Sequence, residues 1–226
     1  RPKFRVYPPP PPPSQPPPPP PQPHPPHPSP EPTPPTTQCA KLAEPHPHEG
    51  FMFAKSVWHY ARGVAYAAQG EADQAKAELA LLRPLIDDVS VRFLDSRDSP
   101  GSTLVGIAID LLQGEIAYRA GDYTAAVASF EKAVAKQDSL PYTEPPFWYY
   151  PSRQSLGAAL LAGGDAPQAE SVFRRDLEQY PHNGWSMFGL IQSLESQGKN
   201  EEAVMVRQHF DNAWQFADIE LTAAVL

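Results

Sequence analysis

The sequence contains a single cysteine, Cys39, among its 226 residues. One thiol cannot form a disulfide within its own chain, so the fold must hold together without such a cross-link. Apolar runs are also short, and none approaches the ~20 residues that a membrane-spanning helix requires. Basic residues are outnumbered, with 18 Lys and Arg against 26 Asp and Glu. This balance argues against nucleic acid as a partner, because phosphates require a basic surface.

Motifs of catalysis and metal binding are missing as well. The sequence has no Gly-rich phosphate loop, no HExxH and no G-x-S-x-G. Cys39 lies in a proline-rich stretch, where no base is held beside it to activate it as a nucleophile. We therefore expect no enzymatic activity, no cofactor and no metal site in the folded part.

The chain starts at Arg1 and not at Met, which suggests a fragment or a processed form. A signal peptide could have been removed, so the sequence leaves the compartment open between the cytoplasm and the cell exterior.

Proline, by contrast, is abundant, and 23 of the 31 prolines lie in residues 1–50. Each proline ring fixes φ at about −65° and removes a donor, and the residue before it is kept out of the helical region. Residues 8–35 are therefore predicted to form an extended polyproline II segment, roughly 90 Å long at ~3.1 Å per residue. We interpret residues 1–50 as a proline-rich arm and residues 51–226 as one folded domain.

Three interpretations of the arm are open. In the simplest, it is a spacer or stalk. Alternatively, Arg5, Pro8 and Pro11 match the basic-x-x-Pro-x-x-Pro pattern that aromatic-grooved domains recognise. A third possibility is loose metal capture by four histidines, His24, His27, His46 and His48. We favour the spacer, because any arginine before a proline run meets the first pattern and the histidines have no fixed geometry.

After Gly50 the sequence adopts a helical period and repeats itself. Three segments align without a gap, and a fourth keeps their central glycine and alanine: GVAYAAQGEADQAKAEL, GEIAYRAGDYTAAVASF, GAALLAGGDAPQAESVF and LIQSLESQGKNEEAVMV. The central glycine predicts the end of one helix in a left-handed conformation. The alanine five residues later lets a second helix cross the first. The pattern therefore predicts a helical hairpin that occurs four times.

In residue type and spacing these segments resemble the tetratricopeptide repeat, over nearly all of residues 51–220. The resemblance implies an all-α solenoid of about four hairpins. The turn glycines are 51, 43 and 34 residues apart, and only the last spacing is the standard period. We therefore expect about 17 extra residues around DDVSVRFLDSRDSPGS and about nine before the third hairpin. Longer strings, such as SVWHYARGVAYAAQG and FRRDLEQYPHNGWSMFGLIQSLESQGK, are similar to the C-terminal part of a family of uncharacterised bacterial proteins with this repeat.

The second extra segment has an unusual composition. Residues 139–151 read SLPYTEPPFWYYP, with four prolines and five aromatic rings. The rings could fill the space between two widely spaced repeats, or form a ligand platform with Glu144 and Arg153. We favour the first hypothesis and expect at least two of four rings to be buried, with Tyr149 or Tyr150 partly exposed: Phe147, Trp148, Tyr149 and Tyr150.

The resemblance also implies a groove along the first helices of the hairpins, where such solenoids hold extended peptides. The repeat pattern maps nine residues to this face: Tyr60, Val64, Leu111, Glu115, Tyr118, Gln154, Trp185, Phe188 and Gln192. This lining is mostly apolar and aromatic, so the expected partner is a protein or peptide with a hydrophobic or proline-containing strand. His59 and Arg62, near Trp58, are interpreted as structural, and Asn183 as the cap of the helix that follows it.

The leading functional hypothesis is a protein- or peptide-binding scaffold that uses this groove and the aromatic segment. In it, the arm is a spacer or a second ligand. Two alternatives stay open. One is a structural subunit of an extracellular or surface assembly, in which the subunits self-associate. The other is the C-terminal fragment of an enzyme whose catalytic repeats lie upstream.

Overall fold

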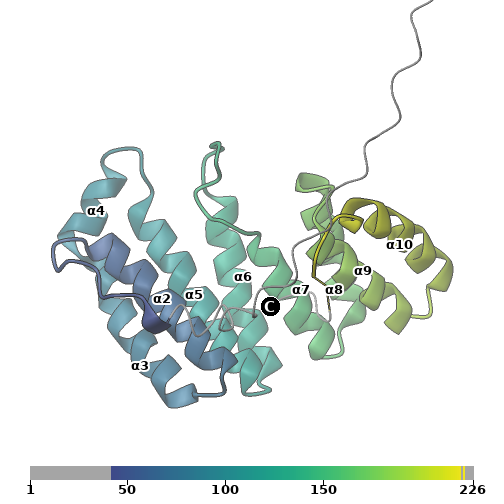
Figure 1. Cartoon of the computed structure of the whole chain (residues 1–226), viewed down its shortest axis with the longest axis horizontal. Helices are drawn as coiled ribbons and strands as arrows, with labels where there is room; N and C mark the ends of the chain where they lie inside the picture. Colours follow the sequence, from purple (N-terminus) through teal and green to yellow (C-terminus); the bar gives the residue numbers. More distant parts are fainter. Residues whose placement is uncertain (1–41, 220, 222–226) are drawn as a thin grey trace, which may run out of the picture. The chain divides into compact units, whose positions relative to one another are not determined.

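The computed structural model describes residues 42–219 and residue 221, all of which belong to one unit of the chain, Pro35–Leu226. The predictions for the arm within residues 1–41 lie outside the described residues. The described part is all-helical and contains no strand. Its main helices form four consecutive hairpins (Figure 1), namely α2 (Met52–Ala68) with α3 (Ala72–Leu82), α5 (Gly101–Arg119) with α6 (Tyr123–Asp138), α7 (Ser152–Ala162) with α8 (Ala166–Gln179), and α9 (Gly184–Ser196) with α10 (Asn200–Trp214).

Each hairpin turns at a glycine with a positive φ. The φ angle is 80° at Gly70, 77° at Gly121, 87° at Gly164 and 73° at Gly198. In all four turns the amide after the glycine donates to the carbonyl five residues before it, as Asp122 does to the carbonyl oxygen of Ala117 at 3.0 Å. This bond caps the first helix, and only glycine takes the required conformation without a steric cost. The predicted hairpins are confirmed.

Small residues allow the helices of the stack to approach closely. The four repeat alanines are all buried: Ala75, Ala126, Ala169 and Ala203. Phe173 of α8 lies between two glycines, since a Cβ added at Gly157 or Gly189 would come within 2.5 or 2.2 Å of its ring. The aromatic residue of the repeat therefore fills the gap to the next hairpin.

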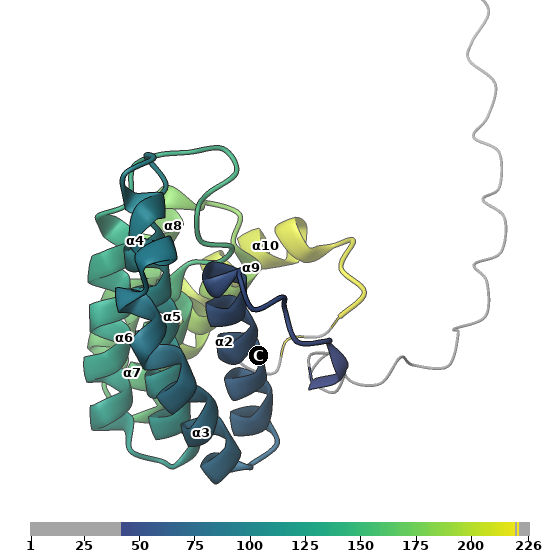
Figure 2. The same ribbon diagram turned by 90° about the vertical axis from the view of Figure 1, so that its left-hand side faces the viewer.

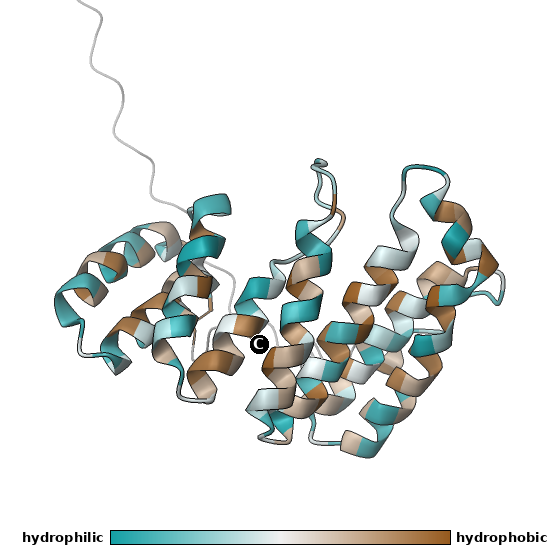
Figure 3. Ribbon diagram, turned by 180° about the vertical axis from the view of Figure 1, so that it is seen from behind, coloured by the Kyte–Doolittle hydropathy of each residue, from teal (hydrophilic) through white to brown (hydrophobic). Residues whose placement is uncertain are grey.

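The hairpins stack in chain order. The first helix of each packs against the first helix of the next, so that α2 contacts α5, α5 contacts α7 and α7 contacts α9. The second helices close the stack, because α3, α6 and α8 each pack against the following first helix. Figure 2 shows α2 and α5 side by side, with α3 and α4 next to them. In Figure 3 apolar and hydrophilic residues alternate along the helices. Within the described residues, no helix is both long and apolar enough to cross a membrane.

The first predicted insertion is a small helical excursion between α3 and α5. It consists of the 3-10 helix η1 (Arg83–Asp87) and helix α4 (Val89–Asp95). Asp88 caps α4, because its Oδ1 accepts a hydrogen bond from the amide of Ser90 at 2.8 Å. Val91 is fully buried, and both elements pack against α5. The excursion thus extends the core of the first two hairpins.

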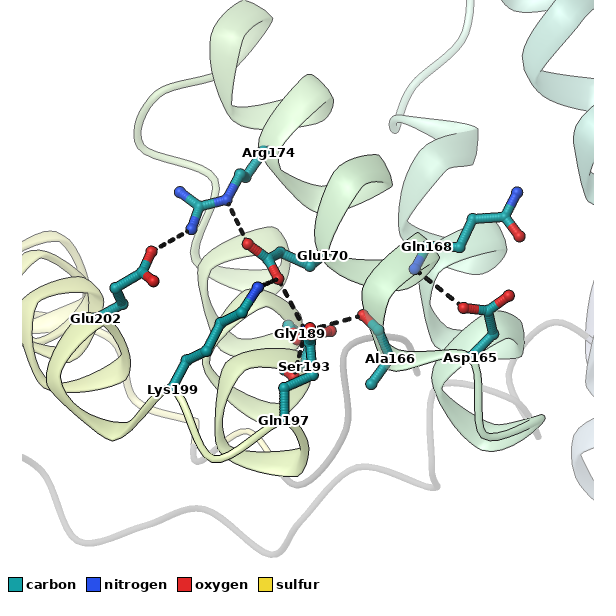
Figure 4. A network of polar contacts seen from close by, with 10 residues as sticks. All are labelled: Asp165, Ala166, Gln168, Glu170, Arg174, Gly189, Ser193, Gln197, Lys199 and Glu202. Carbon is teal, nitrogen blue, oxygen red and sulfur yellow. Dashed lines mark hydrogen bonds and ion pairs between the residues drawn. The ribbon is translucent and has the colours of Figure 1, made fainter.

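A polar network joins the third and fourth hairpins (Figure 4). The carboxylate of Glu170 on α8 accepts hydrogen bonds from Lys199 at 2.7 Å, Gln197 at 2.8 Å and Arg174 at 2.9 Å. Arg174 also pairs with Glu202 of α10 at 2.7 Å. The hydrogen bond from Lys199 lowers the pKa of Glu170 to about 2, so the carboxylate stays ionised and ties the turn between α9 and α10 to α8.

Residues 42–50, which the proline content assigns to the arm, contact α2. Arg62 donates to the carbonyl oxygen of Leu42 at 3.0 Å, and the indole of Trp58 donates to that of Glu44 at 3.2 Å. The ring of His46 packs edge-on against Trp58, with centroids 4.9 Å apart. The chain therefore enters the folded domain along the first helix.

A substitution at one repeat alanine tests the helix crossings. Ala126→Leu should lower the free energy of unfolding by roughly 1–3 kcal/mol, because the added side chain overpacks a fully buried site between α5 and α6. Ala128→Leu, on the exposed face of the same helix, is the matched control and should leave the melting temperature nearly unchanged. Equal melting temperatures for both variants in thermal denaturation would contradict the predicted crossing.

Candidate functional site

The aromatic segment 139–151, called the insert below, reaches back to the first hairpin. Trp148 is buried, and its ring packs edge-on against Tyr60 of α2 with centroids 5.5 Å apart. The hydroxyl of Tyr60 lies 3.4 Å from the hydroxyls of both Tyr149 and Tyr150. The insert therefore bridges the third hairpin and the first, in addition to separating α6 from α7.

The four rings are buried to different degrees. Trp148 is 7% exposed, Phe147 and Tyr150 are half-buried, and Tyr149 is 74% exposed. The expectation of at least two buried rings is therefore not met, because only Trp148 is buried, whereas a partly exposed tyrosine is observed as expected. Trp148, Tyr149 and Tyr150 pack with tilted rings, Tyr149 and Tyr150 being centred 4.8 Å apart, so Trp148 takes the inner position beside the two tyrosines.

Side chains of α6 fix the C-terminal end of the insert. The side-chain amide of Gln137 donates to the carbonyl oxygen of Tyr150 at 3.0 Å and accepts from the amide of Ser152 at 2.7 Å. The guanidinium of Arg153 donates hydrogen bonds to both carboxylate oxygens of Asp138, at 2.7 and 2.5 Å. Glu144, the other charged residue predicted for a ligand platform, instead accepts a hydrogen bond from Tyr142 and is exposed.

A cavity of about 790 Å³, called the first cavity below, lies beside the insert. All four first helices line it together with Phe130, the insert and the loop between α8 and α9. Six of the nine predicted groove residues lie in its wall: Tyr60, Val64, Leu111, Glu115, Gln154 and Trp185. These six residues, which the repeat pattern assigned to one face, therefore lie together in the structure.

The other three predicted groove residues lie outside this cavity: Tyr118, Phe188 and Gln192. The ring of Tyr118 packs edge-on against Tyr123 across its own hairpin turn, 5.7 Å away. Phe188 pairs with Phe210 of α10 at 6.1 Å. Both rings are thus engaged by the second helix of their own hairpin.

The first cavity carries aromatic hydroxyls and little charge. Glu115 is its one carboxylate, and it accepts a hydrogen bond from Arg119 at 2.7 Å. Burial raises the pKa of Tyr150 to about 12, with a smaller contribution from Tyr149. Burial also raises the pKa of Tyr60 well above its usual range, and there Tyr149 and Tyr150 add to the shift. Both hydroxyls therefore stay protonated near neutral pH and can donate to an acceptor such as a main-chain carbonyl.

One wall of the first cavity did not follow from the repeat pattern. It is the loop between α8 and α9, which contributes four consecutive residues after Gln179 of α8: Tyr180, Pro181, His182 and Asn183. Asn183 is the N-cap residue of α9, as predicted, but its side chain makes no capping bond. The side-chain amide donates instead to the buried carboxylate of Asp176 at 2.8 Å, which also accepts from Ser186 at 2.6 Å. Burial raises the pKa of Asp176. These contacts hold the loop against α8. In the sequence, only Asn183, expected as the cap of the next helix, indicated a turn at this position.

The polar residues interpreted as structural are engaged within the fold. Nδ1 of His59 lies 2.7 Å from Glu78, and Arg62 donates to the same carboxylate at 2.8 Å. The guanidinium of Arg62 also lies over the ring of Trp58, 4.5 Å from its centroid. In the part of the chain that the structure describes, no group of three or more His, Cys, Asp or Glu residues could hold a metal ion.

The buried tyrosines predict a loss of stability at alkaline pH. The pKa of Tyr150 is about 12 in the folded protein and about 10 in an unfolded chain. The folded state therefore disfavours ionisation, so this contribution to stability is intact below pH ~10 and declines as the pH rises from about 10 to about 12. Tyr150→Phe should make the decline in melting temperature over this range shallower. Tyr123→Phe is the control, and an identical pH profile for Tyr150→Phe and the parent protein would contradict the assignment.

Comparison with known families agrees with the geometry. Two family models, each described as a tetratricopeptide repeat, match the chain: one covers residues 108–141, and the other covers residues 57–80 and 155–175. The matched segments fall on the first three hairpins. Searches of curated proteins and of solved structures find no significant match. Repeats of this family generally mediate protein–protein interactions, and their domains are typically non-catalytic. The chain is therefore a tetratricopeptide-repeat protein.

Proposed function

We propose that the protein is a scaffold that binds an extended, apolar and proline-containing segment of a partner protein in the first cavity. One observation carries the proposal: α2, α5, α7 and α9 all contribute side chains to a single cavity of about 790 Å³. A volume of this size is within the range of ligand sites. Several residues of a peptide strand could lie along it, and the domain has no need to catalyse a reaction in this role.

The lining supports an apolar partner. No lysine or arginine lines the cavity, so it offers no cation to bind a terminal carboxylate or an acidic side chain. Its walls carry the rings of Tyr149, Tyr150, Tyr180 and Trp185. Aromatic rings bury a large apolar area, and tyrosine hydroxyls keep a donor for the partner's main chain.

The insert provides an internal example of such a ligand. Its sequence EPPFWYYP packs against Tyr60, at one end of the same cavity, through an edge-on ring contact and a hydroxyl cluster. Proline-containing segments are suited to this mode of binding, because their main-chain carbonyls have no internal hydrogen bonds and remain free to accept one. We therefore expect a partner segment that combines prolines with aromatic or other apolar residues.

The proposal also assigns roles to the two parts of the chain. Residues 1–50 act as the spacer arm, and residues 51–226 act as the binding domain. The contacts of Leu42 and Glu44 with α2 attach the arm at the first hairpin.

The test uses a phage-displayed library of random peptides selected on the full chain. The selected sequences should be enriched in proline and aromatic residues. Tyr149→Ala should weaken the best selected peptide by at least about tenfold, which is the effect expected for an aromatic anchor. Because Tyr149 is 74% exposed, its removal should leave the melting temperature nearly unchanged.

Tyr142→Ala is the matched control for this measurement. Tyr142 belongs to the same insert and is 85% exposed, but it does not line the first cavity. Fluorescence polarisation with the labelled peptide should give the parent affinity for this variant. Selection of acidic peptides, or equal affinities for Tyr149→Ala and Tyr142→Ala, would refute the proposed site.

A further inference from the structure

A second cavity, of about 840 Å³, adjoins the first. The insert forms much of its wall, from Leu140 to Trp148, and the last turn of α8 forms another part. Pro151, Gln179 and Tyr180 line both cavities. The insert therefore contributes to two neighbouring sites, through Tyr149 and Tyr150 in the first and through Tyr142 and Trp148 in the second.

The second cavity is associated with unpartnered polar atoms. Within residues 42–219 and 221, four buried side-chain polar atoms make no hydrogen bond: Thr143 Oγ1, Trp148 Nε1, Ser152 Oγ and Asp176 Oδ1. Thr143 and Trp148 line this cavity, whereas Ser152 and Asp176 do not. Buried polar groups without partners are rare in native proteins, so the two donors at this cavity call for an explanation. A ligand that accepts hydrogen bonds from Thr143 Oγ1 and Trp148 Nε1 would supply one.

The charged groups of the cavity do not favour an ionic ligand. Arg153 is paired with Asp138, and Arg175 with Glu178. Glu144 also lines the cavity and accepts a hydrogen bond from Tyr142. Most of the remaining lining consists of aromatic and proline rings, those of Tyr142, Phe147, Trp148 and Tyr180 among them, with the indole N–H that has no acceptor. Aromatic walls with a hydrogen-bond donor suit a polyproline II segment, whose rings pack flat and whose carbonyls are free.

The part of the insert before Trp148 can adjust to such a ligand without loss of main-chain hydrogen bonds. Among the described residues, the main chain of residues 141–149 makes no hydrogen bond with other main-chain groups. A shift that brings Thr143 to the surface of the cavity therefore breaks no main-chain bond in this segment, and Trp148 can keep its contact with Tyr60. The anchors of the insert at Gln137 and Asp138 lie on α6 and can stay in place.

We propose that the second cavity binds a proline-rich segment, and that its occupant is residues 8–35 of a second copy of the chain. This segment, PPPPPPSQPPPPPPQPHPPHPSPEPTPP, has the required chemistry and is present at the same concentration as the cavity. In the polyproline II form that its sequence predicts, at ~3.1 Å per residue, it would be long enough to reach from one molecule to another. The inference does not depend on the peptide proposed for the first cavity.

The experiment measures self-association of the full chain by sedimentation equilibrium over a range of concentrations. Association should increase with concentration, and an excess of a synthetic peptide of residues 8–35 should reverse it. Tyr142→Ala should weaken association by about tenfold, as expected for an aromatic contact, whereas Tyr149→Ala should leave it unchanged. Peptide binding in the first cavity should instead be weakened by Tyr149→Ala and not by Tyr142→Ala. Because the two variants have opposite expected effects, each proposal can fail without the other.

Thr143→Val gives the second readout. The substitution keeps the shape and removes a hydroxyl that has no partner in the free protein, so the melting temperature should stay equal or rise. Self-association should nevertheless weaken severalfold, because the bound segment loses a hydrogen bond. Ser139→Ala, whose hydroxyl donates to the carbonyl of Lys136 and lines neither cavity, is the control.

Three results would overturn the proposal. The first is a monomer at every concentration that also fails to bind the labelled peptide of residues 8–35. The second is association that Tyr142→Ala and Thr143→Val leave unchanged. The third is a monomer that binds the labelled peptide, since this would exclude a second copy as the occupant.

Discussion

The edge-on contact between the rings of Tyr60 and Trp148 joins the first helix of the stack to a segment almost ninety residues later in the chain. The described site depends on this contact. It buries Tyr60 in the face that the solenoid would otherwise leave open, and it sets Tyr149 and Tyr150 over the first cavity. Tyr142 and Thr143, earlier in the same insert, line the second cavity. The hydroxyl of Tyr60 and the side chains of Gln137 and Asp138 on α6 add to the hold on the insert, which forms a wall of both cavities.

The regularity of the stack explains why the insert lies where it does. The glycines that face Phe130 and Phe173 leave no room for a Cβ, so the helix spacing within and between the hairpins is set by close contacts. Extra residues cannot enter such contacts without overpacking them. The longer insertion, around α4, folds as helix against α5 and enlarges the core. The shorter one contains four prolines, cannot become helix, and instead extends to the open face of the first helices. Irregular spacing of the repeats thus creates the candidate site.

Much of the fold could be predicted from the sequence, because its determinants are local. A glycine at the end of a helix and an alanine five residues later specify a turn and a crossing whatever surrounds them, and Gly121 and Ala126 do both. The groove was predictable in part, since the resemblance to the tetratricopeptide repeat implies that Tyr60, Leu111 and Trp185 lie on the same face of the stack. The path of the insert was not, because it depends on a contact with Tyr60 that no local pattern encodes. The position of the loop after α8 could not be predicted either, because it depends on the hydrogen bond from Asn183 to the buried carboxylate of Asp176. Nor could the orientation of Phe188, whose ring packs against Phe210.

The most direct test of this account is a nuclear Overhauser effect between the ring protons of Tyr60 and Trp148, measured on the full chain with selectively labelled tyrosine and tryptophan. Tyr60→Phe, Trp148→Phe and Trp185→Phe variants would assign the signals. With ring centroids 5.5 Å apart, a clear cross-peak should connect the two residues and should disappear in Trp148→Phe but not in Trp185→Phe. A folded protein without this cross-peak would show that the insert does not lie on the first helix, and the arrangement of both cavities would then be wrong.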